Sequence, residues 1–164
     1  MPTHTFVLNG KPVSVDCESD VRLLWVLRDL LHVNGPKYGC AGGVCRACTC
    51  LVNGDSVAVC TLEVGALQPT DEVLTIEGLA DTAPAGADLH PMQEAWIEHD
   101  VAQCGYCQPG QILNAVALVD RVRAEGRTVT DDDLDRIRNV CRCGTYPRIR
   151  TAIRDGAERM ARGG

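Results

Sequence analysis

A short segment with three cysteines constrains this chain more than any other feature of its sequence. Cys40, Cys45 and Cys48 lie in one loop-like stretch that is rich in glycine, and Cys60 follows after a pair of apolar runs. Ten cysteines among 164 residues fall short of the density of small secreted disulfide scaffolds. Their clustering along the chain is more typical of ligands than of disulfides that close long loops. We therefore expect a metal-binding loop in this part of the chain.

The spacing of these four cysteines identifies the kind of site. It reads C-x4-C-x2-C followed by a distant cysteine, which is the pattern of plant-type [2Fe-2S] ferredoxins. Asn53-Gly54 predicts a hairpin that returns Cys60 to the side of Cys48. A structural zinc site usually has two C-x2-4-C pairs or histidine partners, and this segment has neither. We predict that a [2Fe-2S] cluster is held by Cys40, Cys45, Cys48 and Cys60.

The overall charge and hydropathy exclude several classes of function. A net charge of -6 argues against a nucleic-acid binder, because phosphate neutralisation needs a basic surface. The longest aliphatic or aromatic run, 23–27, is much shorter than the ~20 residues that span a bilayer. The first residues show no signal-peptide pattern, so we expect no export signal in this chain.

The residues before position 78 predict a small sheet with one helix. Asn9-Gly10 and Asn53-Gly54 each separate two apolar runs, which predicts two hairpins. Leucines at helical spacing predict a helix, with Asp20 as its N-cap. The expected strands are 6–8, 11–15, 49–52, 57–60 and 73–76, and the expected helix is 21–31.

The second half of the chain predicts helices. The stretch 78–88 is rich in alanine, glycine and proline and has no periodicity, which indicates a linker. We therefore expect one domain at 1–77 and another at 89–164. Proline suits the first position of a helix, and Thr130 with Asp133 predicts a capping box. The expected helices begin near Pro91, span 109–123, follow Thr130 and span 147–161.

Four further cysteines lie directly before two of these predicted helices. A helix N-terminus offers free N–H donors and the positive end of a dipole, which favours a bound anion. Two such ends suit a second [2Fe-2S] cluster, although spacing alone leaves zinc almost equally plausible here. The residues concerned are Cys104, Cys107, Cys141 and Cys143.

Two segments that contain these cysteines resemble a known family. The segments 103–110 (QCGYCQPG) and 139–146 (NVCRCGTY) are similar to the small iron-sulfur subunit of the molybdenum hydroxylases, the xanthine oxidase family. The segments 24–29 and 143–149 also resemble the isoquinoline 1-oxidoreductase alpha-subunit type. The resemblance covers residues 4–160 and favours iron-sulfur over zinc at the second site.

The resemblance implies a fold, partners and a direction of electron flow. It implies an α+β chain with a β-grasp ferredoxin domain followed by a four-helix-bundle [2Fe-2S] domain. Gln103 and Cys143 are implied to contact molybdopterin, in its cytosine dinucleotide form, on a separate large subunit. Electrons are implied to pass from molybdenum to the second cluster, then to the first, and then to a cytochrome or flavin acceptor.

This resemblance also sets the leading functional hypothesis. The chain serves as an electron-transfer subunit, without catalytic residues of its own, while the large subunit hydroxylates an N-heterocycle or an aldehyde. The alternatives are a free-standing ferredoxin-like carrier and a zinc-stabilised interaction module. Assembly in the cytoplasm is implied, with co-export alongside a signal-bearing partner as the other route.

Several residues stand outside this scheme. Arg46 replaces a glycine of the family, and Cys50 replaces an apolar residue. We interpret Arg46 as a solvated charge; a sharper hypothesis is that it raises the potential of the first cluster or docks an acidic or haem-bearing acceptor. Cys17 and Cys50 are expected to be buried as small hydrophobes. Tyr106 and Tyr146 are expected to pack against helices, and the four histidines to be surface or capping residues.

Overall fold

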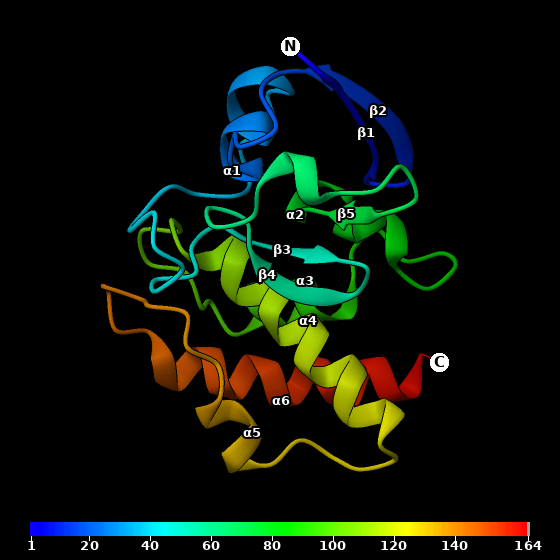
Figure 1. The fold of residues 1–164 in the computed structure, drawn as a ribbon. Coiled ribbons are helices and arrows are strands. Elements are labelled where there is room, and N and C mark those ends of the chain that lie inside the picture. The colour runs from blue at the N-terminus through cyan, green and yellow to red at the C-terminus, as the bar shows by residue number, and fades with distance from the viewer. Residues whose placement is uncertain (164) are drawn as a thin grey trace.

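A mixed five-stranded sheet forms the first half of the chain in the computed structural model, which describes residues 1–163. The strand order is β2-β1-β5-β3-β4, and β1 pairs with β5 in parallel while every other pairing is antiparallel. Figure 1 shows this sheet above a layer of helices. The strands are β1 Thr3–Leu8, β2 Lys11–Asp16, β3 Thr49–Val52, β4 Asp55–Ala58 and β5 Glu72–Leu74.

Both predicted hairpins are present with the expected turn chemistry. Asn9 and Gly10 have φ angles of 48° and 75°, and Asn53 and Gly54 have φ angles of 52° and 86°. Positive φ at both central positions is the signature of a type I′ turn, which matches the twist of the flanking strands. Strand β4 ends earlier than predicted, so Cys60 lies beyond the sheet in a turn.

The predicted helix 21–31 is not a regular helix. It consists of a short α1 (Leu23–Trp25) followed by a π-helical turn (Val26–Leu30), and Asp20 does not cap it. The amides of Leu23 and Leu24 donate instead to the main-chain oxygens of Leu62 and Val59, at 2.8 and 3.1 Å. A neighbouring segment thus satisfies donors that an N-cap side chain usually satisfies.

Helices dominate the rest of the chain. They are α2 Ile76–Leu79, α3 Pro91–Glu98, α4 Gln108–Ala124, α5 Asp131–Asp135 and α6 Tyr146–Arg162. Strand β5 stops before the predicted strand end because the chain turns into α2, and the predicted linker therefore begins inside helical structure. The capping box of Thr130 and Asp133 is present. In the part of the chain that the structure describes, no helix has the length and apolar character to cross a membrane.

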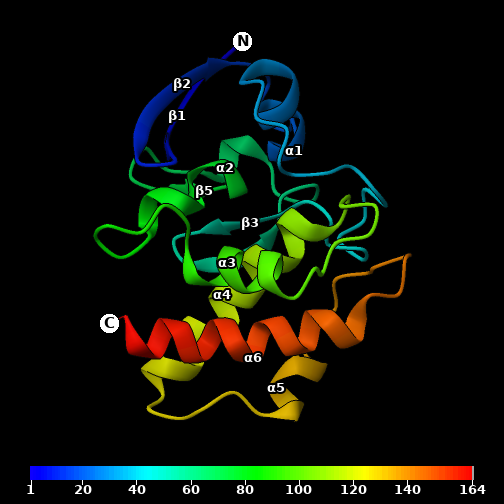
Figure 2. The same cartoon turned by 180° about the vertical axis from the view of Figure 1, so that it is seen from behind.

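Helix α4 joins the two halves of the molecule. It contacts β3 on one side and α3 and α6 on the other, and Figure 2 shows α6 on the far side of α4 from the sheet. Leu51 of β3 belongs to the same buried cluster as Leu113 of α4 and Ile153 of α6. A second buried cluster, which includes Phe6, fills the sheet domain.

Candidate metal centres

The first cysteine loop directs main-chain amides at one sulfur. The N–H groups of Gly42 and Cys45 donate to Sγ of Cys40 at 3.4 and 3.2 Å. These donors, Cys45 first, lower the pKa of Cys40 to about 7. A Cβ at Gly39 would lie 2.6 Å from Sγ of Cys45, so a larger residue at this position would displace that sulfur. The loop is therefore built to hold thiolate sulfur.

The other two cysteines of this set lie in the protein interior. Cys48 and Cys60 are buried, and their thiols are within hydrogen-bonding reach of each other. Burial raises the pKa of Cys48 to about 12. A positively charged iron centre would stabilise the thiolate against this burial cost. Cys17 and Cys50, which the prediction left out of the ligand set, are buried as expected.

The second set of cysteines lies at the start of two long helices. Cys107 occupies the N-cap position of α4, whereas Cys141 and Cys143 lie just before Thr145, the N-cap residue of α6. The thiols form two contacting pairs, each with one member from either segment. Cys104 contacts Cys143 near the surface, and Cys107 contacts Cys141 in the interior.

The electrostatic environment differs between these pairs. Hydrogen bonds from the Tyr106 amide and the Cys143 thiol lower the pKa of Cys104. Burial raises the pKa of Cys107 to about 12. Burial also acts on Cys141, but hydrogen bonds from Thr145, Cys107 and Gly144 together outweigh it and lower the pKa of that thiol. Each set thus contains thiols whose pKa is lowered and thiols whose pKa is raised by burial. The second kind needs a bound cation to stabilise its thiolate form.

The cysteines are arranged in pairs rather than around a point. Within residues 1–163, no three histidine, cysteine, aspartate or glutamate side chains form a group that could hold a single metal ion. Two facing thiol pairs suit a [2Fe-2S] cluster, in which each iron takes two cysteine ligands. The donor set and its pairing therefore fit such a cluster at both sites.

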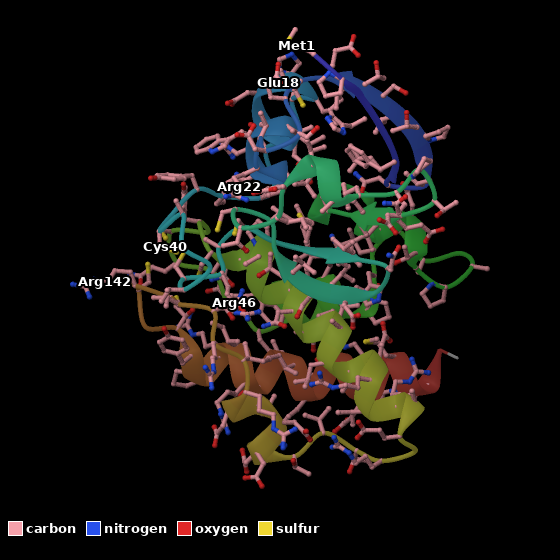
Figure 3. All side chains as sticks on the ribbon, viewed as in Figure 1. Met1, Glu18, Arg22, Cys40, Arg46 and Arg142 are labelled. Atoms are coloured by element: carbon pink, nitrogen blue, oxygen red, sulfur yellow. The ribbon has the colours of Figure 1, made fainter. Side chains whose placement is uncertain are left out.

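Two hydrogen bonds to main-chain oxygens connect the two cysteine loops directly. The amide of Val140, next to Cys141, donates to the main-chain oxygen of Cys45 at 2.9 Å. The side-chain amide of Asn139 donates to the main-chain oxygen of Arg46, also at 2.9 Å. Figure 3 shows Cys40 and Arg142 at the same edge of the molecule. Sequence reasoning did not find these contacts, although Asn139 belongs to the segment that resembled the family.

The two tyrosines near the second site do not pack as predicted. Tyr106 is 49% exposed, and its hydroxyl donates to the main-chain oxygen of Tyr38 at 2.5 Å. Tyr146 is 44% exposed, and its hydroxyl accepts the Cys141 amide at 2.7 Å. Both rings therefore serve the cysteine loops through their hydroxyl groups, and the expectation of packing against helices is wrong.

Gln103 lies on the outer surface of the second site. It is exposed and lines a polar groove of about 610 Å³ together with Gly144, Thr145 and Arg148. Gly144 follows Cys143 directly, so the groove runs beside the exposed Cys104 and the half-buried Cys143. The two residues that the resemblance assigned to pterin contact thus lie at one surface.

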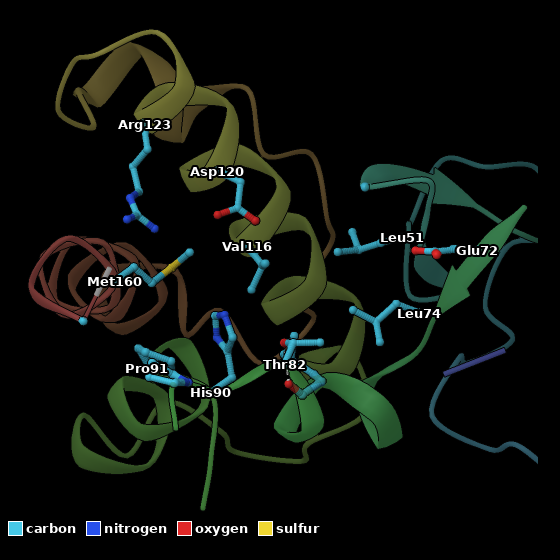
Figure 4. Close-up of a pocket in the computed structure, with 14 residues that line it drawn as sticks. Leu51, Glu72, Leu74, Thr82, His90, Pro91, Val116, Asp120, Arg123 and Met160 are labelled. Atoms are coloured by element: carbon cyan, nitrogen blue, oxygen red, sulfur yellow. Dashed lines mark hydrogen bonds between the residues drawn. The ribbon is translucent and has the colours of Figure 1, made fainter. Parts of the chain in front are cut away.

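A separate cavity lies away from the cysteines. It has a volume of about 390 Å³ and is lined by His90, Val116, Asp120 and Met160 among others. Figure 4 shows these side chains among the helices, with Leu51 and Leu74 on the side toward the strands. None of its lining residues is a cysteine, so this cavity is not part of either candidate centre.

Comparison with known proteins identifies the family. The model of the 2Fe-2S iron-sulfur cluster binding domain matches residues 6–76, and that of the [2Fe-2S] binding domain matches residues 75–154. The chain is 43% identical to the alpha chain of isoquinoline 1-oxidoreductase of Brevundimonas diminuta, over 95% of this chain and 98% of that one. It is 36% identical to the nicotinate dehydrogenase small FeS subunit of Eubacterium barkeri, over 94% of both chains. This chain belongs to the iron-sulfur subunits of the molybdenum hydroxylase family.

Solved structures support the same assignment. Quinoline 2-oxidoreductase from Pseudomonas putida 86 matches with a TM-score of 0.83 and 29% identity, over 99% of this chain and 97% of that one. Aldehyde oxidoreductase from Desulfovibrio desulfuricans matches with a TM-score of 0.86 and 32% identity. This chain covers only 18% of that longer one. The predicted family and the α+β two-domain fold are confirmed, and this iron-sulfur subunit has two [2Fe-2S] binding domains.

Proposed function

We propose that this iron-sulfur subunit carries electrons from a molybdopterin centre on a larger partner through two [2Fe-2S] clusters to an external acceptor. The observation that carries the proposal is the hydrogen bond from Val140 to Cys45, because it joins the loops of the two thiol sets. The proposed ligands of the sheet-domain cluster are Cys40, Cys45, Cys48 and Cys60. Those of the helical-domain cluster are Cys104, Cys107, Cys141 and Cys143.

The partner's cofactor is proposed to lie against the helical domain. Gln103 and the exposed Cys143 loop border one polar groove, which offers an amide and main-chain groups to a pterin. An apolar groove that includes Ile97 and Ala102 adjoins it, and the two grooves share Asp100 and Ala102. A large subunit that covered both would bury the 68% exposed side chain of Ile97. We propose the cytosine dinucleotide form of the cofactor.

The acceptor is proposed to dock beside the sheet-domain cluster. Cys40 and Val44 are exposed there, Val44 to 72%. Arg46, in the same loop, lines a polar groove with three other arginines, and among residues 1–163 none of the four pairs with a carboxylate. An acidic cytochrome or flavin protein fits this surface. The other three arginines are Arg121, Arg136 and Arg138.

The remaining assignments follow from the family. The proposed domains span 1–77 and 89–164, with 78–88 between them. Clusters and pterin are loaded in the cytoplasm in this proposal, and a signal-bearing partner provides the route for co-export. The large subunit performs hydroxylation of an N-heterocycle or an aldehyde, while this chain holds the clusters and excludes water from the buried thiols.

Co-purification tests this function. The chain is expressed with the large subunit that belongs to it, and the complex is analysed for iron, molybdenum and reduction of the clusters by the enzyme's substrate. Cys60→Ser and Cys107→Ser should each remove about half of the iron, and the matched variant Cys17→Ser should remove none. A chain that keeps both clusters but never associates with a large subunit would support the free carrier. Zinc in place of iron would contradict both.

A further inference from the structure

A buried hydrogen-bond chain leads from a tryptophan to one cysteine of the helical domain. The indole Nε1–H of Trp96 donates to Oε1 of Gln108 at 2.6 Å. The Nε2 group of Gln108 donates in turn to Sγ of Cys107 at 3.2 Å. All three residues are nearly inaccessible to solvent, with exposures of 5%, 7% and 7%. Gln108 is the first residue of α4, so its backbone is fixed by the helix.

The tryptophan determines which end of the glutamine amide faces the sulfur. An amide oxygen and nitrogen look alike in many environments, and their assignment then depends on the hydrogen-bond partners. An indole N–H is a donor only, so the group that it contacts on Gln108 has to be the oxygen. The NH2 group is therefore held toward Cys107. Trp96 is a positioning residue, and Gln108 is the donor that it orients.

We infer that Gln108 raises the reduction potential of the helical-domain [2Fe-2S] cluster by donating a hydrogen bond to Sγ of Cys107. This inference rests on the proposed role of Cys107 as a cluster ligand. Reduction adds one electron to the cluster and makes its sulfur atoms more negative. A hydrogen bond to a more negative acceptor is stronger, so the donor stabilises the reduced form more than the oxidised form.

The surroundings of the donor strengthen this effect. No water competes for the amide because the three side chains are buried, and a low local dielectric strengthens electrostatic contacts. The buried NH2 group of Gln108 also needs a partner for stability, so the bond to sulfur fits a structural role as well. The midpoint potential of the cluster separates the two roles, because it responds to a donor on a ligand sulfur.

Redox titration of the purified complex, followed by EPR, tests the inference. Gln108→Leu removes the donor, and Gln108→Glu keeps an acceptor for Trp96 while replacing the donor with a carboxylate. In both variants we expect the helical-domain cluster to become about tenfold harder to reduce, which is ~59 mV for one electron. The sheet-domain cluster in the same sample should keep its midpoint potential. Gln68→Leu, at an exposed glutamine, is the matched control.

Two further variants separate orientation from packing. Trp96→Phe keeps an aromatic ring but releases the Gln108 amide, so we expect a smaller downward shift of the same midpoint. Adding Trp96→Phe to Gln108→Leu should produce no additional shift, because the donor is already absent. Full iron content with an unchanged helical-domain midpoint in both Gln108 variants would overturn the inference. A different result would contradict the proposed function itself: a Cys107→Ser variant that retains the iron of both clusters.

Discussion

The Asn139 side chain connects the two cysteine sites by donating its amide to the main-chain oxygen of Arg46 at 2.9 Å. Its own Oδ1 accepts the Asn114 amide at 2.6 Å, and its main-chain oxygen accepts the Gln111 amide at 2.9 Å. Asn139 is only 2% exposed. Because buried polar groups are costly when unpaired, this network fixes one loop against the other.

Replacement of Asn139 should therefore destabilise the chain. Asn139→Leu leaves the buried Asn114 amide without its partner, at about 1–3 kcal/mol, whereas the Arg46 oxygen keeps its bonds from the amide and hydroxyl of Thr49. We therefore expect the free energy of unfolding to fall by about 1–3 kcal/mol. Urea titration followed by circular dichroism and by cluster absorption measures it. The exposed Asn34→Leu is the control, and equal stability of the two variants would contradict the prediction.

Close packing of α4 against the first loop gives a second prediction. A Cβ at Gly110 would lie 2.6 Å from the main-chain oxygen of Arg46 and 3.2 Å from that of Ala47. Gly110→Ala should therefore force the helix and loop apart and cost about 1–3 kcal/mol. Gly42→Ala is the control, because its nearest contact lies at 3.8 Å. Thermal unfolding of the two variants should differ clearly, and a Gly110→Ala melting temperature equal to wild type would refute this account.

The sequence predicted the local features of both sites but not their connection. Asn53-Gly54 carries its own turn chemistry, so the return of Cys60 to Cys48 followed from a few adjacent residues. Likewise, Thr130 and Asp133 specify a cap within one helical turn. The Asn139–Arg46 contact joins residues far apart in the chain, and no local pattern encodes it.

Tertiary contacts also explain why the prediction of a regular helix at 21–31 is wrong. The π-helical turn after α1 forms where the buried Leu23 and Leu24 are anchored by Leu62 and Val59. Leucine spacing indicated a helix but carried no information about that anchoring segment. The same limit applies to Tyr106, whose hydroxyl partner lies in the other domain.

Arg46 carries a backbone conformation that glycine adopts at lower cost. Its φ angle is 56°, in the left-handed region that costs a non-glycine residue about 1–2 kcal/mol. Glycine also increases the conformational entropy of the unfolded chain, which stabilises that state by about 0.4–1 kcal/mol. This effect offsets part of the stability gained by removing the backbone strain. We therefore expect Arg46→Gly to raise the free energy of unfolding by about 0.5–1 kcal/mol. Arg142→Gly, where φ is not positive, should not stabilise the chain, and stabilisation of neither variant would argue against backbone strain at Arg46.

The charge of Arg46 is tested with the same variant in the assembled enzyme. If the arginine groove docks an acidic acceptor, electron transfer to that acceptor should slow several-fold in Arg46→Gly, and rising salt should narrow the difference. Stopped-flow oxidation of the reduced complex measures the rate, and redox titration reports the potential of the sheet-domain cluster. Unchanged kinetics together with an unchanged potential would contradict both roles of Arg46 and support its interpretation as a solvated charge.

His90 makes the stability of the helical domain depend on pH. Its Nδ1 accepts the Met92 amide at 3.1 Å as the cap of α3, and burial lowers the pKa of His90 from 6.5 to about 4. The folded chain therefore binds fewer protons than the unfolded chain, so stability is complete above pH 6.5 and falls as the pH drops toward 4. Figure 4 shows His90 at the cavity that also contains Asp120, whose pKa is raised by burial and which acts in the opposite direction.

Comparison with a cap that does not titrate isolates the histidine. Asn is a good N-cap and remains neutral, so His90→Asn should keep the cap but lose this pH dependence. Asp120 contributes equally to both proteins and cancels in the difference. Solvent that reaches the cavity screens part of the effect, so we expect wild type to lose about 1 kcal/mol more than the variant between about pH 7 and pH 5. Urea unfolding at both pH values measures this difference, and parallel pH profiles for the two proteins would show that His90 stays protonated or exposed in the fold.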